Sequence, residues 1–178
     1  MPENGIRKVL ISEQEIQTMV ARLGRDITRH YREAGGELLV VGLLKGAFIF
    51  MADLVRAIEY PLQVDFLAVS SYGSGTVSSG DVQMKMDFDE SVSDKNILLV
   101  EDIVDSGNTF NKVMRRLQLK GPRSLKTCAL LSKPSRREVE VVIDFCGREI
   151  PDEFVVGYGL DHAERYRNLG YIGVLGAE

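Results

Sequence analysis

The residues of this chain that could do chemistry are concentrated between Glu101 and Thr109, which read Glu-Asp-Ile-Val-Asp-Ser-Gly-Asn-Thr. Three acids in this stretch follow the apolar run 97–100 and lead into a polar turn that contains a glycine. Consecutive backbone N–H groups and hydroxyls at the start of a helix are suited to bind one phosphate. The carboxylates of Glu101 and Asp102 could hold ribose hydroxyls or a magnesium ion, but not the phosphate itself. The stretch therefore predicts a binding site for a phosphorylated sugar.

Five consecutive residues form the expected phosphate-binding turn: Asp105, Ser106, Gly107, Asn108 and Thr109. The apolar run before the turn predicts a strand buried on both faces, and apolar residues at helical spacing predict a helix over 110–120. The turn would then lie at the edge where open α/β sheets bind ligands. A plainer interpretation is a strand that ends in solvated acids, with Asp105 or Ser106 capping the helix.

The first expected strand also ends in residues suited to phosphate, Lys45 and Gly46. Lysine supplies a cation, and glycine permits close approach of the backbone. Taken alone, an ordinary turn with a solvated lysine is the simpler explanation. Because ligand-binding turns of an open α/β sheet share one edge, we expect this turn to lie beside the 105–109 turn.

Hydrophobic periodicity predicts the other elements. Ser12 and Glu15 have the spacing of a capping box, which opens a first helix that Gly35 and Gly36 end. A second helix is expected over 47–58. Strands are expected over 38–44, 64–72, 82–88, 125–131, 139–145, 154–157 and 171–174.

This alternation of strands and helices predicts an α/β fold, with a mainly parallel central sheet and helices on both faces. The last two strands are too short and too close together for βαβ units. We therefore expect them to form a small cap, or hood, beside the sheet, together with the N-terminal segment. No repeat, composition break or charged linker divides the chain, so residues 1–178 are expected to form a single domain.

Composition limits the classes of function. The net charge of −4 and the pI of about 5.3 argue against a protein that coats nucleic acid or an anionic membrane. No signal peptide or membrane span is recognisable. Cys128 and Cys146 lack metal-ligand spacing, which favours reduced thiols in a cytoplasmic protein. His30 and His162 also lack metal-site spacing; we expect His30 to be solvated, and His162 has no evident partner.

The segment 70–80 is rich in serine and glycine. Such a composition is typical of a flexible linker. Its place between two expected strands favours instead a lid that closes over the site and excludes water, with Ser71 and Tyr72 at its base. The glycines do not form a dinucleotide fingerprint, and the chain has no Walker-type lysine sequence.

The motif at 101–109 resembles the phosphoribosyl diphosphate signature of the type I phosphoribosyltransferases. Leu44-Lys45-Gly46 is similar to the diphosphate turn of the family members that bind 6-oxopurines, a turn that often contains a cis peptide. Ser71-Tyr72 resembles the Ser-Tyr pair of the family's catalytic loop. Lys133 and the later segment 154–161 resemble the purine hood of the hypoxanthine-guanine phosphoribosyltransferases.

This resemblance implies a purine site. By it, Lys133 donates to the 6-oxo group of the base, Phe154 stacks on the purine ring, and the backbone of Val155 reads the ring edge. Asp105 is implied as the general base, which takes a proton from the purine imidazole ring as the new bond forms.

The resemblance also implies roles on the sugar-phosphate side. Glu101 and Asp102 would hold the ribose hydroxyls and a Mg²⁺ ion, and Asp161 would be a further Mg²⁺ ligand. Arg167 would contact the diphosphate with its fork-shaped guanidinium.

The activity implied is purine salvage: Mg²⁺-dependent transfer of the phosphoribosyl group to hypoxanthine, and also to guanine, through an oxocarbenium-like transition state. The resemblance further implies a homodimer or homotetramer that binds neither nucleic acid nor membrane. Two other classes of function remain as alternatives. An RNA-binding regulator with this fold is disfavoured by the acidic balance and the hood. A receiver-type signalling domain is disfavoured because its acidic pair should end the first strand, whereas Glu101 and Asp102 lie mid-chain.

Overall fold

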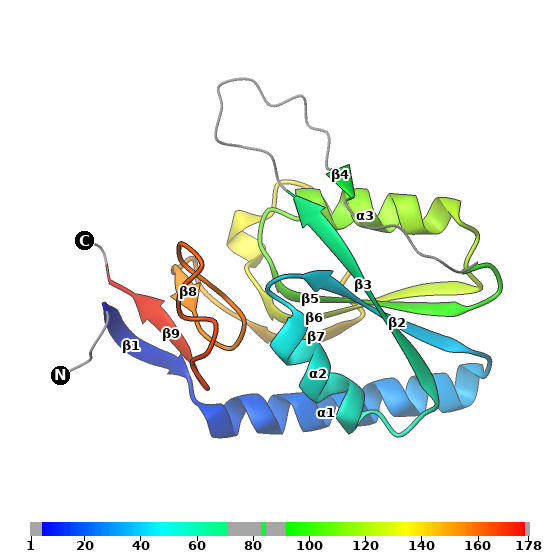
Figure 1. Ribbon diagram of the computed structural model, residues 1–178, viewed down its shortest axis with the longest axis horizontal. Coiled ribbons are helices and arrows are strands. Elements are labelled where there is room, and N and C mark those ends of the chain that lie inside the picture. Colours follow the sequence, from blue (N-terminus) through cyan, green and yellow to red (C-terminus); the bar gives the residue numbers. More distant parts are fainter. Residues whose placement is uncertain (1–4, 71–82, 85–91, 177–178) are drawn as a thin grey trace.

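The computed structural model describes residues 5–70, 83–84 and 92–176. Its central sheet has the strand order β4-β3-β2-β5-β6-β7, in which all neighbours are parallel except β3 and β4. The strands are β2 (Leu38–Leu44), β3 (Leu62–Ser70), β4 (Gln83–Met84), β5 (Asn96–Val104), β6 (Ser124–Ser132) and β7 (Phe145–Glu149). Helices α1 (Glu13–Ala34) and α2 (Phe48–Ala57) cover one face, and α3 (Asn108–Leu119) covers the other (Figure 1). The predicted α/β fold is confirmed.

Apolar residues of the central strands are buried on both sides of the sheet. In β5, Leu98 and Val100 belong to the core beneath α1 and α2, whereas Ile97 and Leu99 belong to the core beneath α3. A strand covered on both faces needs a continuous apolar run, and this is the pattern that predicted β5. No helix in the described part of the chain is long and apolar enough to cross a membrane.

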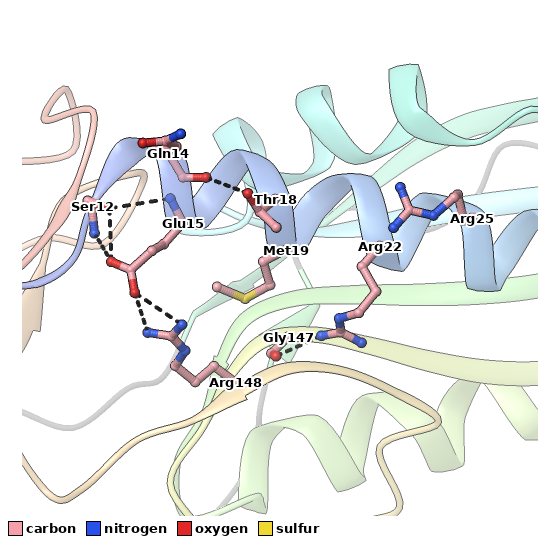
Figure 2. Close-up of a pocket in the computed structure, with 9 residues that line it drawn as sticks. All are labelled: Ser12, Gln14, Glu15, Thr18, Met19, Arg22, Arg25, Gly147 and Arg148. Atoms are coloured by element: carbon pink, nitrogen blue, oxygen red, sulfur yellow. Dashed lines mark hydrogen bonds and ion pairs between the residues drawn. The ribbon is translucent and has the colours of Figure 1, made fainter.

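Helix α1 begins with the predicted capping box. The Glu15 carboxylate accepts from the backbone N–H of Ser12 at 2.9 Å, while the Ser12 hydroxyl accepts from the N–H of Glu15 at 3.3 Å. The N–H and the hydroxyl of Ser12 donate to the Glu15 carboxylate, and these bonds, together with Arg148, lower the pKa of Glu15. Arg22 donates to the Gly147 carbonyl at 2.8 Å. These arginines link α1 to the edge strand β7 (Figure 2). A cavity of about 460 Å³ lies between the two elements.

A small antiparallel sheet lies beside the central one. Its order is β1-β9-β8, with β1 at Ile6–Ile11, β9 at Ile172–Leu175 and β8 at Val155–Val156. Figure 1 shows both ends of the chain at this sheet. The hood predicted from the late strands and the N-terminal segment is therefore confirmed.

The strand predicted over 139–145 is wrong. Strand β7 begins only at Phe145, and a short 3₁₀ turn (Pro134–Arg136) and an irregular segment precede it. The Asp144 carboxylate accepts from the N–H and the hydroxyl of Thr127. These side-chain hydrogen bonds take the place of backbone pairing with β6 before Phe145. Val141 and Ile143 pack on the α3-side core without strand pairing, and this packing explains their alternation.

Other differences from the predictions are smaller. Strand β5 continues beyond 97–100 through the acidic pair to Val104, and β3 is displaced by two residues from the predicted 64–72. Of the predicted strand 82–88, the structure describes only β4. His30 is half-buried rather than solvated, with its ring edge-on to Phe145 at 5.8 Å between centroids.

Candidate active site

The last residues of β5 place two acids inside the protein. Asp102 is buried, with 8% of its surface exposed, and Glu101 is partly buried. The Asp102 carboxylate accepts from the N–H of Ile103 at 2.8 Å, and the Glu101 carboxylate accepts from the N–H of Asp102 at 3.1 Å. The interpretation of this pair as solvated acids is therefore wrong.

This environment shifts both carboxyl groups toward the neutral form. Burial raises the pKa of Glu101 well above its usual range, and the neighbouring Asp102 adds to the shift. Burial also raises the pKa of Asp102, although hydrogen bonds and the charge of Arg167 oppose the rise. A bound cation would offset the cost of these buried charges.

The turn after β5 requires a glycine at its centre. Gly107 has a φ of 84°, and a Cβ at this position would lie 2.7 Å from Cγ2 of Val141. Gly107 is also the N-cap of α3, and the Ser106 hydroxyl accepts from the N–H of Asn108 at 3.3 Å. The turn and the acidic pair line one cavity of about 240 Å³. Its lining residues are Glu101, Asp102, Ile103, Val104, Asp105, Ser106, Gly107, Thr109 and Phe110.

The turn after β2 lies directly against the acidic pair. A Cβ at Gly46 would fall 1.8 Å from Oδ2 of Asp102, so only glycine leaves room for this carboxylate. The Leu44–Lys45 peptide is cis. Lys45 Nζ lies 3.1 Å from the carboxylate of Glu164, which belongs to the loop after β8.

The loop after β8 packs against the turn after β2. A Cβ at Gly159 would lie 2.2 Å from the carbonyl oxygen of Gly46, which shows that the two turns are in contact. Arg167 donates to the Gly159 carbonyl at 2.7 Å and pairs with Asp161 at 2.9 Å. Its Nε is buried and has no hydrogen-bond partner among the described residues. Arg167 thus retains an unused donor beside the acidic pair.

The predicted purine residues come from two places: Lys133 directly follows β6, and Phe154 and Val155 lie at the start of β8. The Lys133 side chain is 8% exposed, its Nζ is 4.0 Å from Asp152, and its backbone N–H donates to the Val104 carbonyl at 3.0 Å. Phe154 is exposed and meets the His162 ring edge-on at 5.4 Å between centroids. His162 therefore has an aromatic partner that the sequence did not reveal. Val155 lies next to Phe154 in β8, with its side chain buried.

Arg136 links the side chain of Asp105 to that of Asp152, which lies near Lys133. Nε of Arg136 lies 3.4 Å from Oδ1 of Asp105, and Nη1 of Arg136 lies 3.7 Å from Asp152. A chain of alternating charges therefore runs from Asp105 through Arg136 and Asp152 to Lys133.

The structure thus brings most of the predicted residues to one edge of the sheet. The turn after β2 contacts Asp102, and the backbone at Lys133 bonds to the end of β5. Asp161 pairs with Arg167 instead of joining Glu101 and Asp102, and the described residues contain no cluster of three or more potential metal ligands. The lid residues Ser71 and Tyr72 lie outside the described residues.

Several contacting side chains were not predicted: Arg136, Arg137, Asp152 and Glu164. Each is a charged residue outside the α-helices and strands, where hydrophobic periodicity gives no information. The nearness of Arg136 and Arg137 to Lys133 in the sequence is the one signal that could have drawn attention to the first two.

The fold and this arrangement define an α/β protein with a candidate binding site at the carboxyl edge of a parallel sheet, and comparison with known proteins gives its family. The model of the phosphoribosyl transferase domain matches residues 12–163. The hypoxanthine phosphoribosyltransferase of Salmonella typhimurium is 54% identical over 166 residues, which cover 93% of each chain. The hypoxanthine-guanine phosphoribosyltransferase of Bacillus subtilis is 51% identical over 175 residues, covering 98% of this chain and 96% of the relative.

The solved structures agree. A hypoxanthine phosphoribosyltransferase from Staphylococcus aureus superposes with a TM-score of 0.91 at 44% identity, covering 97% of this chain and 92% of that one. This chain therefore belongs to the hypoxanthine(-guanine) phosphoribosyltransferases of the phosphoribosyltransferase family.

Proposed function

We propose that this protein transfers the 5-phosphoribosyl group from phosphoribosyl diphosphate to a 6-oxopurine in purine salvage. Hypoxanthine is the preferred base, and guanine is the second. The observation that carries the proposal is the contact of Gly46 with Asp102, because it joins a second turn to the acidic pair and phosphate turn at one edge of the sheet. The names of the relatives with 54% and 51% identity support hypoxanthine and guanine as acceptors.

In this reaction the bond from ribose C1′ to diphosphate breaks, and a bond from C1′ to a purine nitrogen forms. The ribose passes through an oxocarbenium-like transition state, so the protein must stabilise the departing diphosphate and exclude water. Asp105 accepts the proton that the purine imidazole ring loses. Its side chain is 44% exposed, so the carboxylate is accessible for this role.

Lys133 selects the base. Its ammonium group is nearly buried, and Asp152 at 4.0 Å is too far for a strong hydrogen bond. A 6-oxo group offers the acceptor that this donor lacks, whereas the 6-amino group of adenine would place a donor against a donor. The exposed ring of Phe154 provides a face on which the purine can stack.

The acidic pair and Asp161 fit Mg²⁺. This ion usually takes one or two carboxylates from the protein and completes its shell with water and substrate oxygens, so a ready-made cluster of ligands is not required. Glu101 and Asp102 would hold one ion and the ribose hydroxyls, and Asp161 a second position near Arg167. When bound, Mg²⁺ supplies charge neutralisation for the diphosphate. Arg167 would contact the same diphosphate.

The proposal includes a homodimer or homotetramer in the cytoplasm. The free thiols of Cys128 and Cys146 fit a reducing compartment. Sedimentation velocity measures the assembly. A monomer at micromolar concentration would contradict this part of the proposal.

The decisive experiment is turnover. The protein is incubated with Mg²⁺, phosphoribosyl diphosphate and, separately, hypoxanthine, guanine, xanthine, adenine and uracil. We expect nucleoside monophosphate and diphosphate in equal amounts from hypoxanthine and guanine, and loss of both products when EDTA removes the metal. If no base reacts, the chain is a regulator that retains the nucleotide turn. RNA binding would then be measured next.

A further inference from the structure

The segment 137–139 lies behind the turn that would bind the 5-phosphate. Nη1 of Arg137 donates to the carbonyl of Asp105 at 2.6 Å. The backbone N–H groups of Glu138 and Val139 donate to the carbonyl of Ser106 at 3.0 and 3.4 Å. The carbonyls of Asp105 and Ser106 are therefore both held by this one segment.

These bonds fix where the N–H groups of the turn point. The peptides after Asp105 and Ser106 are trans, and in a trans peptide the C=O and the following N–H point in opposite directions. The N–H groups of Ser106 and Gly107 therefore point away from the segment 137–139, and neither makes a backbone hydrogen bond to another described residue. They remain available as donors toward the cavity that the turn lines.

The Arg137 guanidinium also contacts the end of β6, directly before the predicted purine-binding residue Lys133. Nη2 of Arg137 donates to the hydroxyl of Ser132 at 2.8 Å, and Ser132 is buried directly before Lys133. The ends of β5 and β6 are paired in the sheet at Val104 and Ser132, and the rigid guanidinium plane adds a second link between the phosphate turn and the residue before the purine-reading lysine. The Arg137 side chain also packs behind Gly107, since a Cβ there would lie 3.2 Å from Cδ of Arg137.

We propose that Arg137 is a positioning residue for both substrates: it turns the N–H groups of Ser106 and Gly107 toward the 5-phosphate and fixes Lys133 at the matching distance. The proposal rests on the proposed function. Arg137 does not touch the reacting atoms in this account. Its effect should therefore appear in substrate affinity more than in the chemical step.

Arg137→Met and Arg137→Lys test the proposal. We measure the Kd of phosphoribosyl diphosphate with Mg²⁺ by calorimetry, the KM for hypoxanthine, kcat and Tm. Methionine keeps much of the length and removes both bonds, so we expect Kd and KM each to rise about tenfold or more, which corresponds to about 1.4 kcal/mol or more. Lysine can reach one acceptor but not both with matched geometry, and we expect intermediate values. The kcat should fall less than the affinity.

Arg22→Met is the matched control, because Arg22 also donates to backbone carbonyls, at Cys146 and Gly147, far from the site. It should lower Tm without changing Kd or KM. Unchanged affinity in a folded Arg137→Met variant would overturn the proposal, as would an equal loss of affinity in Arg22→Met. If Arg137→Met does not fold, wild-type affinity in Arg137→Lys would overturn it equally. Absence of turnover in the wild-type protein would instead count against the proposed function.

Discussion

The carboxylate of Asp102 fills the space in which a side chain at position 46 would begin. Oδ2 of Asp102 lies 1.8 Å from the ideal Cβ position of Gly46, and Cγ lies 2.6 Å from it. Asp102 is on β5 and Gly46 follows β2, its neighbour in the sheet. The absence of a side chain at one strand end thus allows the carboxylate of the next strand to occupy the site.

Gly46→Ala should therefore abolish most turnover while the protein still folds. The new methyl group must displace either Asp102 or the turn after β2, because both atoms of contact belong to a buried carboxylate. We expect kcat/KM to fall by about 10² or more, since a displacement of about 1 Å in a positioning group has effects of that size. Gly170→Ala is the control, because its nearest neighbour is the flexible end of Glu13. Wild-type kinetics in Gly46→Ala would show that the contact is dispensable.

Lys133→Met should change which base is used. Removing a donor from a buried acceptor costs about 1–3 kcal/mol, so the ratio of hypoxanthine to adenine turnover should fall by about 5- to 150-fold. Lys126→Met on the same strand is the control, because Lys126 pairs with Asp144 instead of facing the site. The measurement is kcat/KM with each base. An unchanged ratio in a folded variant would remove Lys133 from base recognition.

Asp105→Asn should keep the fold and the binding of phosphoribosyl diphosphate but lose chemistry. The Asp105 carbonyl still accepts from Arg137, whereas the amide cannot take up a proton. Single-turnover rates should fall about 10²- to 10⁴-fold, or roughly 3–5 kcal/mol. Calorimetry of phosphoribosyl diphosphate separates this loss from weaker binding. A normal single-turnover rate would mean that another group is the general base. Asp26→Asn on α1 serves as the control.

The elements that carry the site were predictable because their signals are local. The capping box of Ser12 and Glu15, the apolar run of β2 and the glycine of the turn before α3 each report on a few neighbouring residues. The edge at which strands β2, β5 and β6 end followed from the general geometry of parallel sheets. This is why the contact between the two turns could be expected before the structure was known.

What the sequence did not reveal depends on tertiary contacts. The late start of β7 results from the bonds between Asp144 and Thr127, two residues that lie far apart in the sequence. The hold of Arg137 on Asp105 is likewise a contact between separate loops. Such pairings obey no period, so neither hydrophobic pattern nor motif spacing could indicate them.

The acidic pair should cost stability in return for function. The folded-state pKa values of Glu101 and Asp102 are raised, so the folded protein binds protons more tightly than the unfolded chain. The contribution of this pair to the free energy of unfolding should therefore be most favourable below about pH 4, where both states are protonated at these groups. It should fall as the pH rises from the ordinary carboxyl range through the raised values.

Glu101→Gln tests this trade of stability for activity. The amide keeps the shape and removes the buried charge, so its Tm should exceed that of the wild type at pH 8 and approach it at pH 4, while turnover falls. Glu140→Gln, which alters an exposed carboxylate, is the control and should show no such pH dependence. Thermal unfolding without Mg²⁺ at both pH values gives the comparison. A Tm difference that is the same at pH 4 and pH 8 would mean that the Glu101 charge does not destabilise the metal-free protein. The proposal of a cation at this pair would then rest on its geometry alone.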